Sequence, residues 1–244
     1  PLFPLPAKKY EAFPSGEEEV DLTLFSHGSR IRRREVALVF NAIDSVEGLT
    51  QVLNTLAEYD LRVTFFICGE FIRRHPEAVR EIAEAGHEVG SLFYVYFDMT
   101  DARYRVDKDF VKKGLARNED DYFLITGKEL SLLWHAPYYV VNTDIVEASR
   151  EMNYTYVSKD VDPLDWVTST DRAVSTGMYA SAADIVLRIL AQKKPGSIIP
   201  IRIGQPTDGQ REDYLFTQLD LLLNALITSG YSVVTVSTLM EHAE

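Results

Sequence analysis

Five polar side chains of this sequence could take part in chemistry, because each lies in a loop that follows a predicted strand. They are Asp44, Asp98, His135, Asp162 and Asp165. Carboxylate and imidazole groups bind divalent metals, but a metal site needs three or four of them within about 2.0–2.3 Å of one ion. Acidic residues scattered over loops are usually solvated, and we expect that here. The sequence also has no nucleophile elbow and no glycine-rich loop that could cradle a phosphate.

Aromatic side chains are dense in the same loops. They are Phe93, Tyr94, Tyr96, Phe97, Trp134, Tyr138, Tyr139 and Trp166. Tyrosine and tryptophan combine an apolar ring with a polar group, which suits the faces and hydroxyls of sugars. The rings either fill a hollow in the domain or line a groove that binds a glycan without cutting it. The two roles are compatible if Leu92 and Phe93 fill the hollow while Tyr94 and Tyr138 face outward and bind the glycan.

Short apolar strands alternate with amphipathic helices from residue 36 onward, which predicts an α/β fold with a mostly parallel sheet. The predicted strands cover residues 36–40, 63–67, 87–91, 130–134, 154–158, 197–203 and 232–236. The predicted helices cover residues 46–59, 70–85, 108–116, 143–152, 182–192, 214–227 and 237–242. About seven strand–helix units fit an irregular (β/α) barrel. Functional residues of such barrels lie in loops after the carboxyl ends of the strands, here residues 41–45, 91–98, 135–139, 159–166 and 202–206.

The composition is that of a soluble globular domain with an ample core, at 244 residues and 46% hydrophobic content. The formal net charge of −12 argues against binding to nucleic acid phosphates without a local basic patch. The only dense basic run, residues 30–34, is interpreted as the solvated entrance to the first predicted strand. The single cysteine, Cys68, excludes an internal disulfide and is expected in the core. No stretch reaches the roughly 18 apolar residues that a membrane span needs.

The first 34 residues differ from the rest of the chain. They open with the proline-rich run PLFPLPAKKYEAFP, followed by an acidic segment, and they lack the continuous apolar core of a signal peptide. We therefore predict a linker or extended arm over residues 1–34 and one domain over residues 35–244. Such a chain is expected to be a domain cut from a longer precursor.

The stretch from Glu35 to Asp98 carries a recognisable framework. It begins EVALVFNAIDS and later reads RVTFFICGEFIRRHPEAVREIAEAGHEVGSLFYVYFD. In its spacing and framework residues it resembles the polysaccharide deacetylase family, the NodB-type carbohydrate esterases. The resemblance extends over about residues 36–244, and it implies the same irregular barrel.

The resemblance also implies a metal centre whose residues are replaced in this chain. The family's first strand ends in TFDDG and a later turn reads HTxxH, where this chain reads VFNAI and LFYVY. The position of the catalytic base falls on Asn41, and the three metal-ligand positions fall on Ala42, Leu92 and Tyr96. Alanine and leucine have no lone pair to give, and a neutral tyrosine is a poor ligand. We therefore expect no metal cofactor and no family-type hydrolysis.

Catalytic positions of the family's later motifs are also replaced in this chain. The family's RxPY motif reads HAPY here, with His135 at the arginine position, and the position of the acid histidine falls on Arg202. A guanidinium cannot donate a proton at neutral pH. Only DPLDW, residues 162–166, stays close to the family's DxxDW pattern, which shapes the groove. The predicted substrate-binding residues are Tyr94, Tyr96, Tyr138, Asp165 and Trp166.

Three functions are compatible with these residues. We favour a catalytically inactive deacetylase-like domain that binds carbohydrate or serves as a module of a larger protein. One alternative is a carbohydrate esterase that removes N- or O-acetyl groups by altered chemistry, and another is a structural or protein-interaction domain. The expected partner is a polysaccharide or glycan, together with other domains of a longer chain, and no nucleic acid. The family's substrates place the chain outside the cytoplasm, as a secreted, periplasmic or cell-surface protein.

Overall fold

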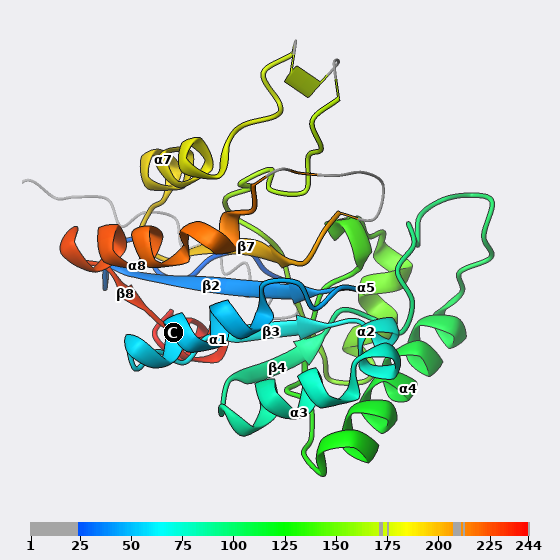
Figure 1. Cartoon of the computed structure of the whole chain (residues 1–244). Coiled ribbons are helices and arrows are strands. Elements are labelled where there is room, and N and C mark those ends of the chain that lie inside the picture. The colour runs from blue at the N-terminus through cyan, green and yellow to red at the C-terminus, as the bar shows by residue number, and fades with distance from the viewer. Residues whose placement is uncertain (1–23, 171–172, 175, 207–210, 212, 244) are drawn as a thin grey trace, which may run out of the picture.

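The computed structural model describes residues 24–170, 173–174, 176–206, 211 and 213–243. Its strands form one parallel sheet in the order β1-β6-β5-β4-β3-β2-β7, with β8 paired to β2 (Figure 1). The strands are β1 Leu24–Phe25, β2 Glu35–Ala42, β3 Thr64–Ile67, β4 Glu88–Ser91, β5 Leu133–Trp134, β6 Thr155–Val157, β7 Ser197–Ile203 and β8 Ser232–Val233. The predicted parallel α/β fold is confirmed, with an irregular, barrel-like sheet.

Helices cover the outside of this sheet. In Figure 1, α7 and α8 lie on one side of β2, and α1, α3 and α4 lie on the other. The α-helices are α1 Leu49–Glu58, α2 Gly69–Arg74, α3 Pro76–Glu84, α4 Lys108–Thr126, α5 Thr143–Arg150, α7 Ala182–Gln192, α8 Leu219–Thr228 and α9 Val236–Glu241. Two 3₁₀ turns, Pro137–Tyr139 and Leu215–Gln218, complete the described elements. None of the described helices is both long and apolar enough to cross a bilayer.

β2 is the longest of the described strands, and it is buried on both faces. Its residues alternate between two apolar clusters because successive side chains of a strand point to opposite faces. Leu38 and Phe40 pack outward under the helices, whereas Ala37 and Val39 pack inside the barrel. Asn41 follows this alternation onto the inner face, at the carboxyl end of the strand. The continuous apolar run before it is thus explained by burial on both sides.

Backbone hydrogen bonds bridge the seam between the two ends of the strand order. Gly28 N donates to Gly196 O at 2.8 Å, and Asp160 N donates to Ile198 O at 3.0 Å. A side chain at Gly196 could not be accommodated, because its Cβ would lie 2.5 Å from the backbone of Gly28 and its φ is +81°. Arg30 crosses the same seam, with Nη2 2.6 Å from the Asp160 carboxylate.

The boundary predicted at residue 34 is therefore too late. β1 pairs with β6, and Arg30 donates to the Pro195 carbonyl at 2.9 Å as well as to Asp160, so the residues from Leu24 onward belong to the folded domain. A two-residue strand has no periodicity that could have marked it in the sequence. The rest of the predicted arm, residues 1–23, lies outside the described residues.

Two predicted helices differ from those in the structure. The helix predicted over residues 70–85 is broken into α2 and α3 at His75, whose φ of −132° and ψ of 56° are not helical. Pro76 explains the break, since proline disfavours the helical conformation of the residue before it. α4 runs to Thr126, ten residues past the predicted end at residue 116. Its buried face includes Asn118, which donates to the Ile67 carbonyl at 3.1 Å, and this polar residue interrupts the apolar pattern.

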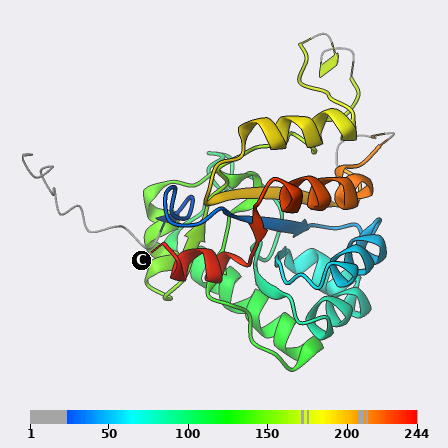
Figure 2. The ribbon, with the colours of Figure 1, turned by 90° about the vertical axis from the view of Figure 1, so that its left-hand side faces the viewer.

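The carboxyl-terminal helix α9 packs at the amino-terminal ends of the strands. The loops predicted to carry function lie at the other end of the barrel. Figure 2 shows it at the start of β2, where His242 lies 2.9 Å from Glu35. Val236 N donates to Thr64 Oγ1 at 2.9 Å, which fixes the helix to the first residue of β3. α9 thus covers the amino-terminal side of the barrel, away from the loops that follow the strands.

The Arg30–Asp160 pair should contribute to stability in a pH-dependent way. Burial alone would raise the pKa of Asp160, but hydrogen bonds from Arg30 and Ser197 outweigh it and hold the pKa below the usual 3.8. The stabilisation is therefore complete above pH 3.8 and is lost as the pH falls through the lower folded-state value. Asp160→Asn should lower the free energy of unfolding by about 1–2 kcal/mol at neutral pH in urea denaturation. Asp120→Asn on the exposed face of α4 is the control, and equal stability of the two variants at neutral pH would contradict the prediction.

Candidate functional site

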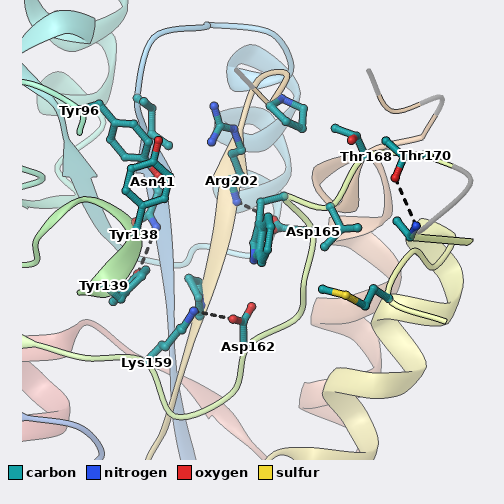
Figure 3. A pocket seen from close by; sticks show the side chains of 17 residues that line it. Asn41, Tyr96, Tyr138, Tyr139, Lys159, Asp162, Asp165, Thr168, Thr170 and Arg202 are labelled. Atoms are coloured by element: carbon teal, nitrogen blue, oxygen red, sulfur yellow. Dashed lines mark hydrogen bonds and ion pairs between the residues drawn. The ribbon is translucent and has the colours of Figure 1, made fainter. Parts of the chain in front are cut away.

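A cavity of about 670 Å³ opens at the carboxyl ends of the strands (Figure 3). It draws residues from the ends of β2 and β7 and from the loops that follow β4, β5 and β6. These are the five segments that the barrel prediction singled out. The volume lies within the range of about 300–1,000 Å³ that is typical of small-molecule sites.

The bottom of the pocket is a neutral hydrogen-bonded network centred on Asn41. Its Oδ1 lies 3.0 Å from His135 Nε2, and its Nδ2 donates to the Tyr139 hydroxyl at 3.1 Å. The ring of Tyr139 stacks on the imidazole, with centroids 4.0 Å apart and an angle of 6°. Burial lowers the pKa of His135 to about 3 and raises the pKa of Tyr139 well above 10. Both groups are therefore uncharged at neutral pH.

The three positions that correspond to metal ligands do not fit a divalent ion. Ala42 packs into the outer core cluster, and Leu92 is fully buried in the inner cluster, with Tyr96 packed against that cluster. Burial raises the pKa of Tyr96 to about 12, so its phenol stays protonated. Within the residues that the structure describes, no three histidine, cysteine, aspartate or glutamate side chains are grouped so that they could hold a metal. Ala42, Leu92 and the protonated Tyr96 therefore offer no ligand set for a divalent ion.

Two aromatic surfaces flank the pocket opening. The rings of Tyr96 and Tyr138 have centroids 4.7 Å apart, and Tyr138 is 50% exposed. Trp166 lines the pocket from the loop after β6 and is 48% exposed. Tyr138 and Tyr139 both have positive φ angles, 59° and 60°, a conformation that bulky residues rarely adopt and that is concentrated at functional sites.

Other predicted aromatic residues lie elsewhere. Tyr94 does not line the pocket, because its ring lies between the guanidinium groups of Arg73 and Arg117, at 4.2 and 4.5 Å. Phe93 and Trp134 are fully buried in a third apolar cluster. Tyr94, predicted to bind substrate, is therefore not among the residues that line this pocket.

The charged residues of the pocket are mostly paired. Lys159 lies 2.5 Å from Asp162, and Arg202 lies 3.5 Å from Asp44. Asp165 is only 8% exposed and accepts the backbone N–H of Arg202 at 2.7 Å. Burial raises the pKa of Asp165 to about 6. Burial thus makes the Asp165 carboxyl costly to ionise. Ionisable groups with strongly shifted pKa values are common at catalytic and binding sites.

One wall of the pocket was not predicted from the sequence. The connection between β6 and α7 supplies Val167, Thr168 and Met178 to the lining. Buried Arg211 donates to the carbonyls of Val167 and Ala180, both at 2.6 Å, and so holds the two ends of this connection together. The length of the segment between residues 157 and 182 was the available signal, because long connections are often functional.

The chain is similar to known proteins over most of its length. A family model described as polysaccharide deacetylase matches residues 28–157. The peptidoglycan-N-acetylglucosamine deacetylase of Bacillus cereus is 23% identical over 222 residues, which cover 91% of this chain and 74% of that protein. A chitooligosaccharide deacetylase of Sinorhizobium fredii is 28% identical over 189 residues, covering 75% of this chain and 81% of the relative.

Solved structures share the fold. A CE4 family pseudoenzyme from Bacillus anthracis superposes with a TM-score of 0.76 at 19% identity, covering 92% of this chain and 71% of that one. A family 4 carbohydrate esterase of Bacillus subtilis superposes with a TM-score of 0.75 at 19% identity, covering 91% and 87%. These similarities establish the fold at low sequence identity.

Asp165 should lower the stability of the domain at neutral pH. Between pH 3.8 and about 6 the folded protein keeps a proton that the unfolded chain has released, so stability falls as the pH rises through this window. Asp165→Asn retains an oxygen that accepts the Arg202 N–H and removes the cost of ionisation. We expect its free energy of unfolding to exceed that of the wild type by about 1–3 kcal/mol at neutral pH. The gain should shrink toward pH 4 in urea denaturation, and a loss of stability at neutral pH would refute this assignment.

Proposed function

The chain belongs to the polysaccharide deacetylase family, and we propose that within this family it holds a glycan in its pocket without metal-dependent hydrolysis. The observation that carries this proposal is the contrast between the two parts of one site. The groove is open and lined by aromatic rings, whereas the positions of the metal ligands are filled by apolar or uncharged side chains.

The groove supports the binding half of the proposal. Tyr138 and Trp166 expose about half of their surfaces at the opening, where a sugar ring can pack on an aromatic face. The partly buried Lys159–Asp162 ion pair, in the loop after β6, adds polar atoms to the pocket lining. A few fixed polar groups within a largely apolar lining are the usual composition of a ligand site.

The chemistry of the replaced residues supports the second part of the proposal, the absence of metal-dependent hydrolysis. An amide at position 41 cannot accept a proton from water as a carboxylate does, and position 202 holds an arginine in place of a histidine that could act as the acid. His135 is buried, and its pKa of about 3 leaves it neutral. The Bacillus anthracis neighbour is described as a pseudoenzyme, and a mutant of it has restored enzymatic activity. This fold is therefore found in a protein described as inactive.

A second function, ester or amide hydrolysis by altered chemistry, has one observation in its favour. Among the described carboxylates, Asp165 is the one whose pKa is raised toward neutrality, which suits a general base. Among the described residues, no histidine is hydrogen-bonded to its carboxylate to assist attack on an acetyl carbonyl. Release of acetate from acetylated chitooligosaccharide by the wild-type protein would select this function over simple binding.

The relatives' names indicate the substrate class and the location. They act on peptidoglycan and chitooligosaccharides, so we propose β-1,4-linked amino-sugar polymers as the ligand class. Peptidoglycan lies outside the cytoplasm, and we propose the same location for this chain.

Glycan binding should depend on the exposed aromatic rings. Tyr138→Ala and Trp166→Ala should each weaken binding of amino-sugar oligomers by about tenfold, equivalent to about 1.4 kcal/mol, in calorimetric titrations with a chelator present. Phe123→Ala is the matched control, because Phe123 is 55% exposed on α4, away from the pocket lining. All variants should unfold at temperatures close to the wild type. Unchanged affinity in both pocket variants, or no binding by the wild type, would count against the proposal and favour a structural role.

A further inference from the structure

One carboxylate of the pocket lining, Asp165, forms no direct ion pair with a described side chain. The two cations that line the pocket are each within ion-pair distance of another acid, Lys159 with Asp162 and Arg202 with Asp44. Across the part of the chain that the structure describes, no lysine, arginine or histidine lies within 4.0 Å of the Asp165 carboxylate. Its one hydrogen bond is the backbone N–H of Arg202, at 2.7 Å. Asp165 is thus the lining carboxylate that no direct ion pair neutralises, and Arg202 and Arg211 act on it only at longer range.

Asp165 lines the cavity although the residue is largely buried. The residue is 8% exposed and contributes to the lining of the pocket. Figure 3 shows it beside the end of β7, with Tyr138 and Tyr139 on another side of the same cavity. A buried carboxylate without a paired cation is unfavourable, and a ligand that brings a positive charge to it relieves that cost. A neutral ligand that covers it makes the cost greater.

The surrounding side chains suit a cation as well. The faces of Tyr138 and Trp166 carry negative electrostatic potential, so they attract an ammonium group in addition to packing on a sugar ring. The protein as a whole has a net charge of −12, which favours the approach of a positively charged oligomer.

We propose that the pocket selects glycans with free amino groups, and that the Asp165 carboxylate receives the ammonium of a deacetylated amino sugar. This inference rests on the proposed glycan-binding function and narrows its ligand class. It assigns to this chain the recognition of a sugar that has already lost its acetyl group. A deacetylation reaction must therefore supply the ligand.

The test compares two probes that differ only in acetylation. Purified protein is titrated calorimetrically at about pH 7 with chitohexaose, in which every sugar carries an amine that is at least partly protonated, and with its fully N-acetylated counterpart. We expect chitohexaose to bind at least about tenfold more tightly. Asp165→Asn should abolish this preference, and it stays folded because it keeps the acceptor for the Arg202 N–H.

A charge-matched variant separates a specific contact from general attraction. Asp120→Asn removes the same charge from the exposed face of α4 and should keep the preference for chitohexaose. Equal loss in both variants, or no loss in Asp165→Asn, would overturn the assignment of Asp165. Equal binding of the two probes, or tighter binding of the acetylated probe, would overturn the inference and leave the proposed glycan binding intact. Failure of both probes to bind would remove the proposed function together with the inference.

Discussion

The parallel arrangement of the strands around β2 is the constraint on which the rest of this molecule depends. Because the strands are parallel, their carboxyl ends share one side of the barrel, and the loops that follow them meet there. α9 and its contacts with Glu35 and Thr64 close the other end. β2 is buried along its whole length, so the last residues of this strand are the ones that reach a solvent-facing site. The described pocket lies at this end of the barrel.

The opening is where, in the function we propose, this chain differs from a hydrolytic member of its family. A buried site gains catalytic power from charged groups that are held by the fold, and a buried charge is tolerated only with partners. Here the network of Asn41, His135 and Tyr139 satisfies the polar atoms at the bottom without any charge. The positions on either side are filled by apolar packing. The fold has kept a rigid, shaped cavity, and the charge that remains in it belongs to residues of the loop after β6 and of β7.

The fold was largely predictable because local patterns and burial agree. The apolar run in β2 and the amphipathic face of α7 follow directly from two-sided and one-sided burial. α4 was predicted too short because Asn118 occupies an inward position and is satisfied by a hydrogen bond across the core. The site was predictable in its location, since the strand ends fix it, but not in its details. Nothing in the sequence shows that Tyr94 lies between two arginines or that Arg211 holds a distant loop against the pocket, because both depend on contacts between separate segments.

We propose that this member of the family has a carbohydrate pocket without a metal centre, and a metal-binding measurement tests this most directly. Protein freed of metal by chelation is titrated with Zn²⁺ in a calorimeter, and metal content is measured after dialysis. The account predicts no stoichiometric binding, since Ala42, Leu92 and the protonated Tyr96 offer no ligand set. Tight binding of one ion per chain would contradict the account and would mean that other side chains have rebuilt a metal centre.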